Sequence, residues 1–318
     1  MPKPPRVSVV IPSLTGRVDA LQGSIARQTL QPLEVHVIEG VAPSGRARNL
    51  GAAKARGELI LFVDDDAVLG NEHVIERLAA PFSRPGAQAL GVTGSAKILP
   101  PGVGWFQRRV AYEIPRMIHP VVDTDVESNP STDGYGFTEI TTTCAMVHAR
   151  AFDAAGGFHE ALHRGVDTEF FFQVRKRGFR FWLIADTWVH HPVPGTLREL
   201  LAKFHEMGIW HAQEAMLDPE RRIGPELRNP LLALGYLAFR AAYLLPNVFV
   251  PTSRAYRKLE LGFKPLKALA SFVNACGYAR SAVFRRTPHR TPEGEPKAGS
   301  ATTAGAAAAV STEQTSSP

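Results

Sequence analysis

Cysteine is scarce in this sequence of 318 residues, which contains only Cys144 and Cys276. The two lie far apart, so they indicate neither a disulfide framework nor the paired spacing of a zinc site. Their scarcity argues against a disulfide-stabilised secreted domain and favours a reducing, cytoplasmic setting. The N-terminal residues MPKPPRVSVVIP also lack an apolar stretch long enough for a signal peptide.

The sequence lacks the glycine-rich loop that two nucleotide-binding folds need after their first strand. The first predicted strand, Val7–Ile11, is followed by the turn PSLTG at positions 12–16. A dinucleotide-binding protein would carry G-x-G-x-x-G in this turn, and a sugar nucleotidyltransferase usually carries a glycine-rich loop there. The turn therefore argues against NAD binding and leaves nucleotidyl transfer only as an alternative.

Acidic residues are almost absent from residues 251–290, where Glu260 is the only one. Nine basic residues and one acid give this stretch a charge of 9 − 1 = +8. This exceeds the net charge of +6 of the whole chain, so the remainder is slightly acidic. Such a segment implies an anionic partner, either a membrane or nucleic acid. The basic residues are Arg254, Arg257, Lys258, Lys264, Lys267, Arg280, Arg285, Arg286 and Arg290.

Short apolar runs alternate with helical patterns in the first part of the chain. Strands are predicted at 7–11, 33–38 and 59–63, and helices at 19–28 and 44–56 between them. Strand–helix alternation of this kind is typical of an α/β fold with a mostly parallel sheet flanked by helices.

The pattern changes after Pro194, where only helices are predicted, at 196–217, 231–250 and 265–284. Residues beyond 286 are rich in Ala, Thr, Ser and Pro, which predicts disorder. The predicted parts are an α/β domain at 1–195, a helical extension suited to a membrane at 196–286 and a disordered tail at 287–318.

Two of the late helices suggest contact with a membrane. Residues 231–250 have the length of one bilayer span, but Pro246 interrupts them and Arg240 at their centre costs ~2.5–3.5 kcal/mol to insert. Residues 265–284 are amphipathic and flanked by basic residues, as in a helix that lies in the interface of an anionic membrane. The alternative is that both helices pack on the α/β domain.

The stretch Glu58–Leu69, written ELILFVDDDAVL, organises the predicted site. Three adjacent carboxylates repel one another, so they need a cation or solvent. Because side chains alternate along an extended chain, Asp64 and Asp66 should point one way and Asp65 the other. At the carboxyl edge of a parallel sheet, such a pair suits Mg²⁺ or Mn²⁺ beside a diphosphate. The alternative is a solvated acidic turn.

Four motifs, in this order, resemble glycosyltransferase family 2, whose enzymes have the Rossmann-like GT-A fold. They are similar to its nucleotide-binding turn, its metal-binding strand, its acceptor-site helix and its closing strand with a histidine. The resemblance covers residues 7–195 and implies an inverting transfer of a sugar from a nucleotide diphosphate. The motifs are VSVVIPSLTGR (Val7–Arg17), SGRARNLGAAKARGELILFVDDD (Ser44–Asp66), AFDAAGGFHEALHRGVDTEFFFQVRKRG (Ala151–Gly178) and ADTWVHHP (Ala185–Pro192).

The resemblance also implies binding residues. Asp66, with Asp64, is implied as a ligand of Mn²⁺ or Mg²⁺, and His190 or His191 would complete the site. Either histidine could equally be structural, and Arg48 could be a solvated residue on a helix face. Glu39 stands where the family commonly has an Asp that binds the nucleobase, so the identity of the nucleobase is left open. Residues implied at the nucleotide sugar are Pro12, Ser13, Thr15, Glu39, Arg48, Asp64 and Asp65.

Asp167 matches the catalytic base of the family, the second residue of a Glu-Asp pair. Val166 stands at the first position of that pair, which is a departure from the family pattern. Glu169 is therefore the alternative base. Asp167 is also well placed to cap the helix predicted at 168–178, a role that does not exclude catalysis.

Taken together, these features predict an inverting glycosyltransferase, assisted by a divalent cation, that acts on a hydroxyl of a glycan or lipid-linked acceptor. For the basic segment we expect an anionic membrane surface and not nucleic acid. The enzyme would then lie peripherally on the inner face of the cell membrane and contribute to cell-envelope polysaccharide synthesis. The alternatives are a non-catalytic nucleotide-sugar-binding module, which Val166 favours, and a sugar nucleotidyltransferase.

Overall fold

The computed structural model describes residues 5–114, 117–128, 140–217, 219, 222, 224–250, 252–253, 259–260 and 262–284. One compact unit spans Met1–Pro288. The tail predicted at 287–318 lies outside the described residues, as do six of the nine basic residues of segment 251–290. The domain boundary near residue 195 stays a prediction.

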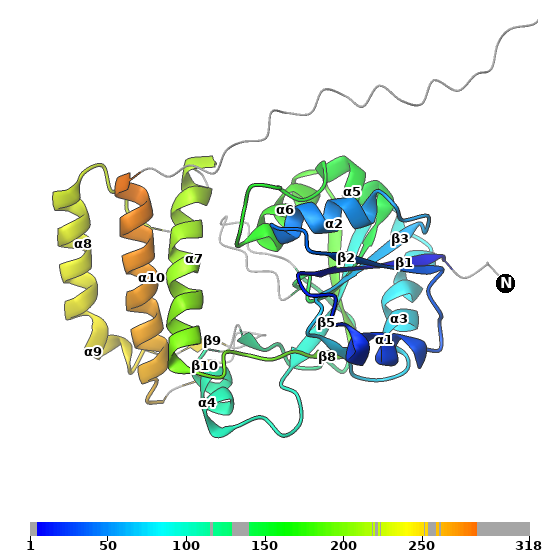
Figure 1. Ribbon diagram of the computed structural model, residues 1–318, viewed down its shortest axis with the longest axis horizontal. Coiled ribbons are helices and arrows are strands. Elements are labelled where there is room, and N and C mark those ends of the chain that lie inside the picture. The colour runs from blue at the N-terminus through cyan, green and yellow to red at the C-terminus, as the bar shows by residue number, and fades with distance from the viewer. Residues whose placement is uncertain are drawn as a thin grey trace, which may run out of the picture. The chain divides into compact units, whose positions relative to one another are not determined.

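A mixed sheet occupies the centre of the N-terminal part (Figure 1). Its strands are β1 (Val7–Ser13), β2 (Glu34–Glu39), β3 (Leu59–Val63), β4 (Val68–Leu69), β5 (Leu90–Ile98), β6 (Val126–Glu127), β7 (Cys144–His148) and β8 (Arg180–His190). They are ordered β2-β1-β3-β7-β5-β8-β4, with β6 beside β8. β1 is parallel to β2 and β3, and β5 is parallel to β8. β7 lies antiparallel between β3 and β5, which the sequence analysis did not anticipate.

Helices cover both faces of this sheet, as expected for the predicted α/β class. They are α1 (Asp19–Ala26), α2 (Ser44–Ala52), α3 (Val74–Ala79), α5 (Ala149–Ala155) and α6 (Val166–Lys176). Side chains alternate along β3, so Leu61 packs under α1 and α3 while Phe62 packs under α5 and α6. Burial of β3 on both faces explains its unbroken apolar sequence.

β1 continues through Pro12 to Ser13, although the sequence predicted that the strand ends at Ile11. The last residue of β1 that pairs with β3 is Val10, whereas pairing with β2 extends to Ser13. The missing N–H of Pro12 therefore leaves no carbonyl of β3 without a partner, and the strand tolerates the proline.

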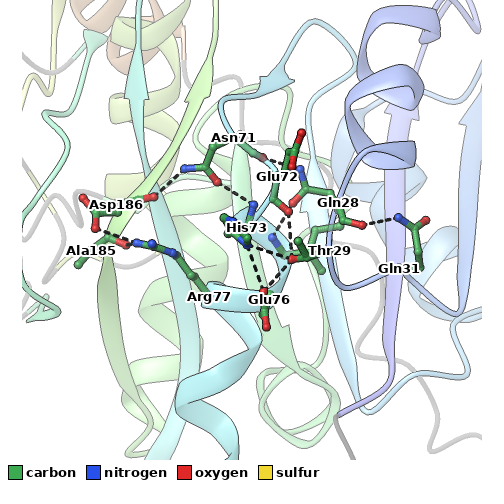
Figure 2. A network of polar contacts seen from close by, with 11 residues as sticks. Gln28, Thr29, Gln31, Asn71, Glu72, His73, Glu76, Arg77, Ala185 and Asp186 are labelled. Carbon is green, nitrogen blue, oxygen red and sulfur yellow. Dashed lines mark hydrogen bonds and ion pairs between the residues drawn. The ribbon is translucent and has the colours of Figure 1, made fainter.

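β8 is one strand that contains a bulge. Asp186 has a positive φ of 50°, and the pairing with β5 shifts register there. A polar network holds this bulge (Figure 2): Asn71 Nδ2 donates to the Asp186 carbonyl at 2.9 Å, and Arg77 contacts the Asp186 carboxylate at 2.8 Å. The bulge resets the register so that His190 pairs with both β4 and β5.

The described residues of the C-terminal part form helices and one short ribbon, so the prediction of helices alone after Pro194 was wrong for this ribbon. The elements of this part are α7 (Leu197–Leu217), α8 (Pro230–Ala242), α9 (Leu244–Asn247), the antiparallel strands β9 (Thr252–Ser253) and β10 (Leu259–Glu260), and α10 (Pro265–Phe284). α10 lies between α7 and α8 and contacts both (Figure 1). The segment predicted as one long helix at 231–250 is divided into α8 and α9. Among the described residues, no helix combines the length and apolar character needed to cross a bilayer.

α7 and α10 cross closely because each presents a glycine at the contact. A Cβ at Gly208 would lie 1.9 Å from the backbone oxygen of Asn274, and a Cβ at Gly277 would lie 2.1 Å from that of His205. α7, α10 and α4 (Trp105–Glu113) share one apolar cluster. Protein therefore covers much of the apolar side of α10, which the sequence analysis had placed against a membrane.

This close crossing predicts opposite effects for glycine substitutions in the helical part. Gly208→Ala and Gly277→Ala should each lower the free energy of unfolding by ~1–3 kcal/mol or more, because a methyl group meets backbone atoms that cannot move aside. Gly235→Ala is the matched control, since no atom lies within 4 Å of its added Cβ. It should raise stability by ~0.5–1 kcal/mol through helix propensity. Denaturant titration measures all three, and wild-type stability in Gly208→Ala would contradict the contact.

Candidate active site

The three aspartates after β3 each turn to a different partner. Asp64 Oδ1 accepts from Arg48 Nη2 at 2.7 Å, and Asp65 Oδ2 accepts from Ser13 Oγ at 2.7 Å. Asp66 Oδ1 lies 3.3 Å from His191 Nε2. Asp64 Oδ2 lies 4.0 Å from the same histidine nitrogen, so Asp64 and Asp66 share one side and Asp65 faces another. The sidedness agrees with the expectation, but its cause differs: Asp65 and Asp66 lie in a turn, closed by the Ala67 N–H on the Asp64 carbonyl at 3.1 Å, and not in extended chain.

Asp64, Asp66 and His191 form a group that could hold a metal ion, since one ligand atom of each lies within 4.8 Å of the others. The donors are two carboxylate oxygens and one imidazole nitrogen, a set that suits Mn²⁺ or Mg²⁺. His191 is fixed by its backbone N–H, which donates to the Ile98 carbonyl at 3.0 Å. The neighbouring His190 lies outside the group, with Nδ1 at 3.0 Å from the Leu99 carbonyl.

Arg48 supplies the buried positive charge that Asp64 needs. Its Nη1 also donates to Ser44 Oγ at 3.0 Å, and its guanidinium lies over the Phe158 ring at 5.5 Å. Burial acts to raise the pKa of Asp64, but the charges of Arg48 and His191 and a hydrogen bond from Thr143 lower it overall. Asp64 is therefore ionised at neutral pH. Arg48 is thus a buried ion-pair partner and not a solvated helix-face residue.

The residues expected at the nucleotide lie at the adjoining ends of β1 and β2. Ser13 Oγ accepts from the Gly16 N–H at 3.0 Å, which closes the turn after β1. Gly16 has a φ of 69°, and a Cβ there would lie 2.8 Å from the Glu39 carboxylate. Thr15 is exposed in the same turn, and Pro12 pairs with β2. The turn and Glu39 therefore lie together, with Ser13 linking them to Asp65.

Asp167 lies in the first turn of α6, half-buried, and its Oδ1 accepts from the Thr168 N–H at 3.0 Å. Val166, which departs from the family pattern, is buried in the core between Gly45 and the aromatic cluster. A carboxylate at that position would be desolvated without a partner, so valine is the compatible residue. Glu169 accepts a hydrogen bond from Gln173 at 2.9 Å on the same helix.

Two lysines that the sequence analysis missed lie beside these carboxylates. Burial lowers the pKa of Lys97 on β5, and three negative charges oppose that effect. Those charges belong to Asp167, Asp64 and Asp66. Burial lowers the pKa of Lys203 on α7 to about 8, and repulsion from Lys97 adds to the effect. Lys97 is the only charged residue of β5, which could have signalled a site, whereas Lys203 belongs to no motif.

α7 also packs against the loop that precedes Asp167. Arg164 Nε donates to Glu206 Oε2 at 2.6 Å, and the Trp210 ring lies against Gly165, which has a φ of 68°. A Cβ at Gly165 would lie 1.7 Å from that ring. The helical part of the chain thus helps to place Asp167 and adds Lys203 to the same site.

Comparisons with known proteins match a family model and many solved structures. The model of the family described as Glycosyl transferase family 2 matches residues 16–155. No curated protein matches the chain in sequence. The chain is similar to the mannosyltransferase PcManGT from Pyrobaculum calidifontis, solved in complex with GDP-Man and Mn²⁺, with 14% identity, a TM-score of 0.52, and coverage of 90% of this chain and 89% of that one. This likeness shows the shared fold and confirms the expected GT-A class.

The chain also matches the crystal structure of S. aureus TarS, with 16% identity and a TM-score of 0.43. That match covers 64% of this chain and 39% of TarS.

The adjacent histidines provide a matched test of the Asp64–Asp66–His191 group. His191→Gln and Asp66→Asn should each weaken Mn²⁺ binding by at least ~10-fold, because each removes one donor atom. His190→Gln should leave Mn²⁺ affinity unchanged. Mn²⁺ titration followed by electron paramagnetic resonance, with and without GDP or UDP, measures the difference. Equal affinities in the two histidine variants would rule out the group as a metal site.

Proposed function

We propose that the chain is a glycosyltransferase of family 2, whose model matches residues 16–155, and that it performs a metal-assisted, inverting transfer of a sugar. The donor is a nucleotide-diphosphate sugar, and the acceptor is a hydroxyl of a glycan or lipid-linked molecule. One observation carries the proposal: Asp64, Asp66 and His191 each offer a ligand atom within 4.8 Å of the others. The candidate base Asp167 follows Val166, which packs against Gly45 on α2, the helix whose Arg48 binds Asp64.

The donor set supports a divalent cation at Asp64, Asp66 and His191. PcManGT, which shares the fold, was solved with GDP-Man and Mn²⁺. When bound, such a cation stabilises the charge that develops on the leaving phosphate as a Lewis acid. In this chain Arg48 keeps Asp64 ionised and fixed, so the carboxylate is ready as a ligand.

We assign the proton transfer to Asp167. The acceptor oxygen attacks the anomeric carbon, the bond from that carbon to the diphosphate oxygen breaks, and the acceptor proton passes to the Asp167 carboxylate. Since Oδ1 accepts from the Thr168 N–H, Oδ2 is the oxygen left for this proton. One displacement without a protein nucleophile inverts the anomeric configuration. Glu169 also accepts one hydrogen bond, from Gln173, and is kept as the alternative base, because the resemblance to the family places the base at Asp167.

Lys97 and Lys203 suit the negative diphosphate of the donor. They lie on the β5 and α7 side of the three aspartates, across from the turn at Ser13 and Glu39, where the nucleoside is expected. Both are partly buried and repel each other, and the nearby carboxylates offset this only in part, since both lysine pKa values remain lowered. A diphosphate supplies a counter-anion, so we assign the phosphate farther from the nucleoside to this pair.

For the acceptor we propose a lipid-linked or envelope glycan, with the enzyme attached peripherally to the inner face of an anionic membrane. The basic segment 251–290 supports the anionic surface. The two alternatives are a non-catalytic nucleotide-sugar-binding module and a sugar nucleotidyltransferase. The first would neither transfer nor hydrolyse a nucleotide sugar, and the second would form one from a sugar 1-phosphate and a nucleoside triphosphate.

Replacement of the base tests the mechanism. Asp167→Asn should lower turnover by ~10²–10⁴-fold, since general-base catalysis contributes about this much. Binding of the donor should remain, because the amide keeps the shape of the side chain. Glu169→Gln is the matched control and should retain most turnover. Activity assays with GDP- and UDP-sugars, with NMR of the product, measure both; retained anomeric configuration would refute the single displacement.

Replacement of Lys203 tests the phosphate assignment. Lys203→Ala should weaken binding of GDP or UDP by ~10-fold, because a charge-assisted contact is lost. Binding of GMP or UMP should be unchanged, as these lack the second phosphate. Lys54→Ala, at an exposed lysine in the turn that follows α2, is the control. An equal loss for monophosphates and diphosphates, measured by calorimetry, would contradict the assignment.

A further inference from the structure

The outer surface of α8 and α9 is apolar throughout. Its most exposed residues include Leu231, Phe239 and Leu245, which are 78%, 63% and 71% exposed. In the fully described stretch 231–249, no exposed residue carries a charge; all are Leu, Phe, Tyr, Ala, Gly or Pro. A soluble surface rarely presents so many large apolar side chains without a charged residue among them. We call these residues the α8–α9 face: Leu231, Leu232, Leu234, Phe239, Leu245 and Phe249.

Arg240, the one charged residue of this stretch, points away from the face. Its Nη2 donates to the Ser271 carbonyl on α10 at 3.0 Å, and its Nη1 donates to the Tyr236 hydroxyl at 3.2 Å. The arginine thus fastens α8 to α10 and leaves the opposite side of the helix apolar. The charge that argues against insertion of residues 231–250 across a bilayer does not oppose contact of this face with the bilayer surface.

The face lies on the side of α10 away from α7, where α8 and α9 form the edge of the helical part (Figure 1). Aromatic residues extend it toward the start of α10: the Phe249 and Phe263 rings lie 5.9 Å apart, and Phe263 is also exposed. Since α7 is the helix that contributes to the active site, α8 and α9 are free to contact another surface without covering that site.

The charge of the neighbouring segment indicates which surface contacts the α8–α9 face. The segment that directly follows α9 in sequence contains Arg254, Arg257 and Lys258, and residues 251–290 carry nine basic residues against one acid. A second copy of the chain docked here would bring two such segments together, which like-charge repulsion opposes. Anionic lipids attract the same segment while their acyl chains accept the apolar side chains.

We propose that the α8–α9 face inserts into the headgroup region of an anionic membrane and that α10 holds it from behind. The inference rests on the proposed function in that it specifies how the enzyme reaches a lipid-linked acceptor. It assigns the contact with lipid to α8 and α9 and not to α10, whose apolar side packs on protein. Insertion is shallow, because the face belongs to helices that lie along the protein and do not cross the bilayer.

The test uses the full chain and vesicles of phosphatidylglycerol and phosphatidylcholine at low salt, without nucleotide. Wild-type protein should sediment with the vesicles, and added salt should weaken binding because it screens the basic segment. Leu234→Glu and Leu245→Glu should weaken binding by roughly ten-fold or more, since each puts a charge where an apolar group is buried. Leu50→Glu on α2, at an exposed leucine outside the face, is the matched control and should bind like wild type.

Three measurements make the result decisive. Thermal unfolding of the face variants should match wild type, because the replaced side chains are exposed. Vesicle binding by Leu245→Glu at the wild-type level would overturn the proposal, as would a wild-type dimer in light scattering that the same variant dissociates. Binding of GDP or UDP in solution is measured separately. Loss of vesicle binding with intact nucleotide binding concerns the face alone, whereas absence of nucleotide binding in the wild type would refute the proposed function.

Discussion

Three consecutive carboxylates at the end of a buried strand impose the main constraint on this structure. Their mutual repulsion is relieved because each meets a partner from a different element: Arg48 on α2 for Asp64, Ser13 on β1 for Asp65, and His191 after β8 for Asp66. The strand order brings the ends of β1, β3 and β8 to one edge, so the fold and the neutralisation of the site depend on each other.

The position of His191 depends on a structural detail far from the carboxylates. The bulge at Asp186, held by Asn71 and Arg77 (Figure 2), shifts the register of β8 against β5. Without that shift, the two histidines would exchange sides of the sheet, because side chains alternate along a strand. The bulge therefore determines which histidine faces the aspartates.

The helical part is more than an attachment to the α/β domain. α7 carries Lys203 toward the site, and its Glu206 and Trp210 hold the loop before Asp167 through Arg164 and Gly165. α10 then packs on α7 through paired glycines and carries α8 on its other side. The apolar outer face of α8 and the polar site at α7 are thus connected by one stack of helices.

The sequence by itself determined the α/β class, the burial of β3 and most of the helices after Pro194, but not the ribbon of β9 and β10 between them. Each of these follows from local periodicity or from the order of motifs. The tertiary structure alone decided that His191 and not His190 joins the aspartates, that Lys97 and Lys203 face them, and that Arg240 turns inward. Spacing along a chain encodes which face a residue occupies, but not which distant element packs against that face. Contacts between elements far apart in sequence therefore completed the site.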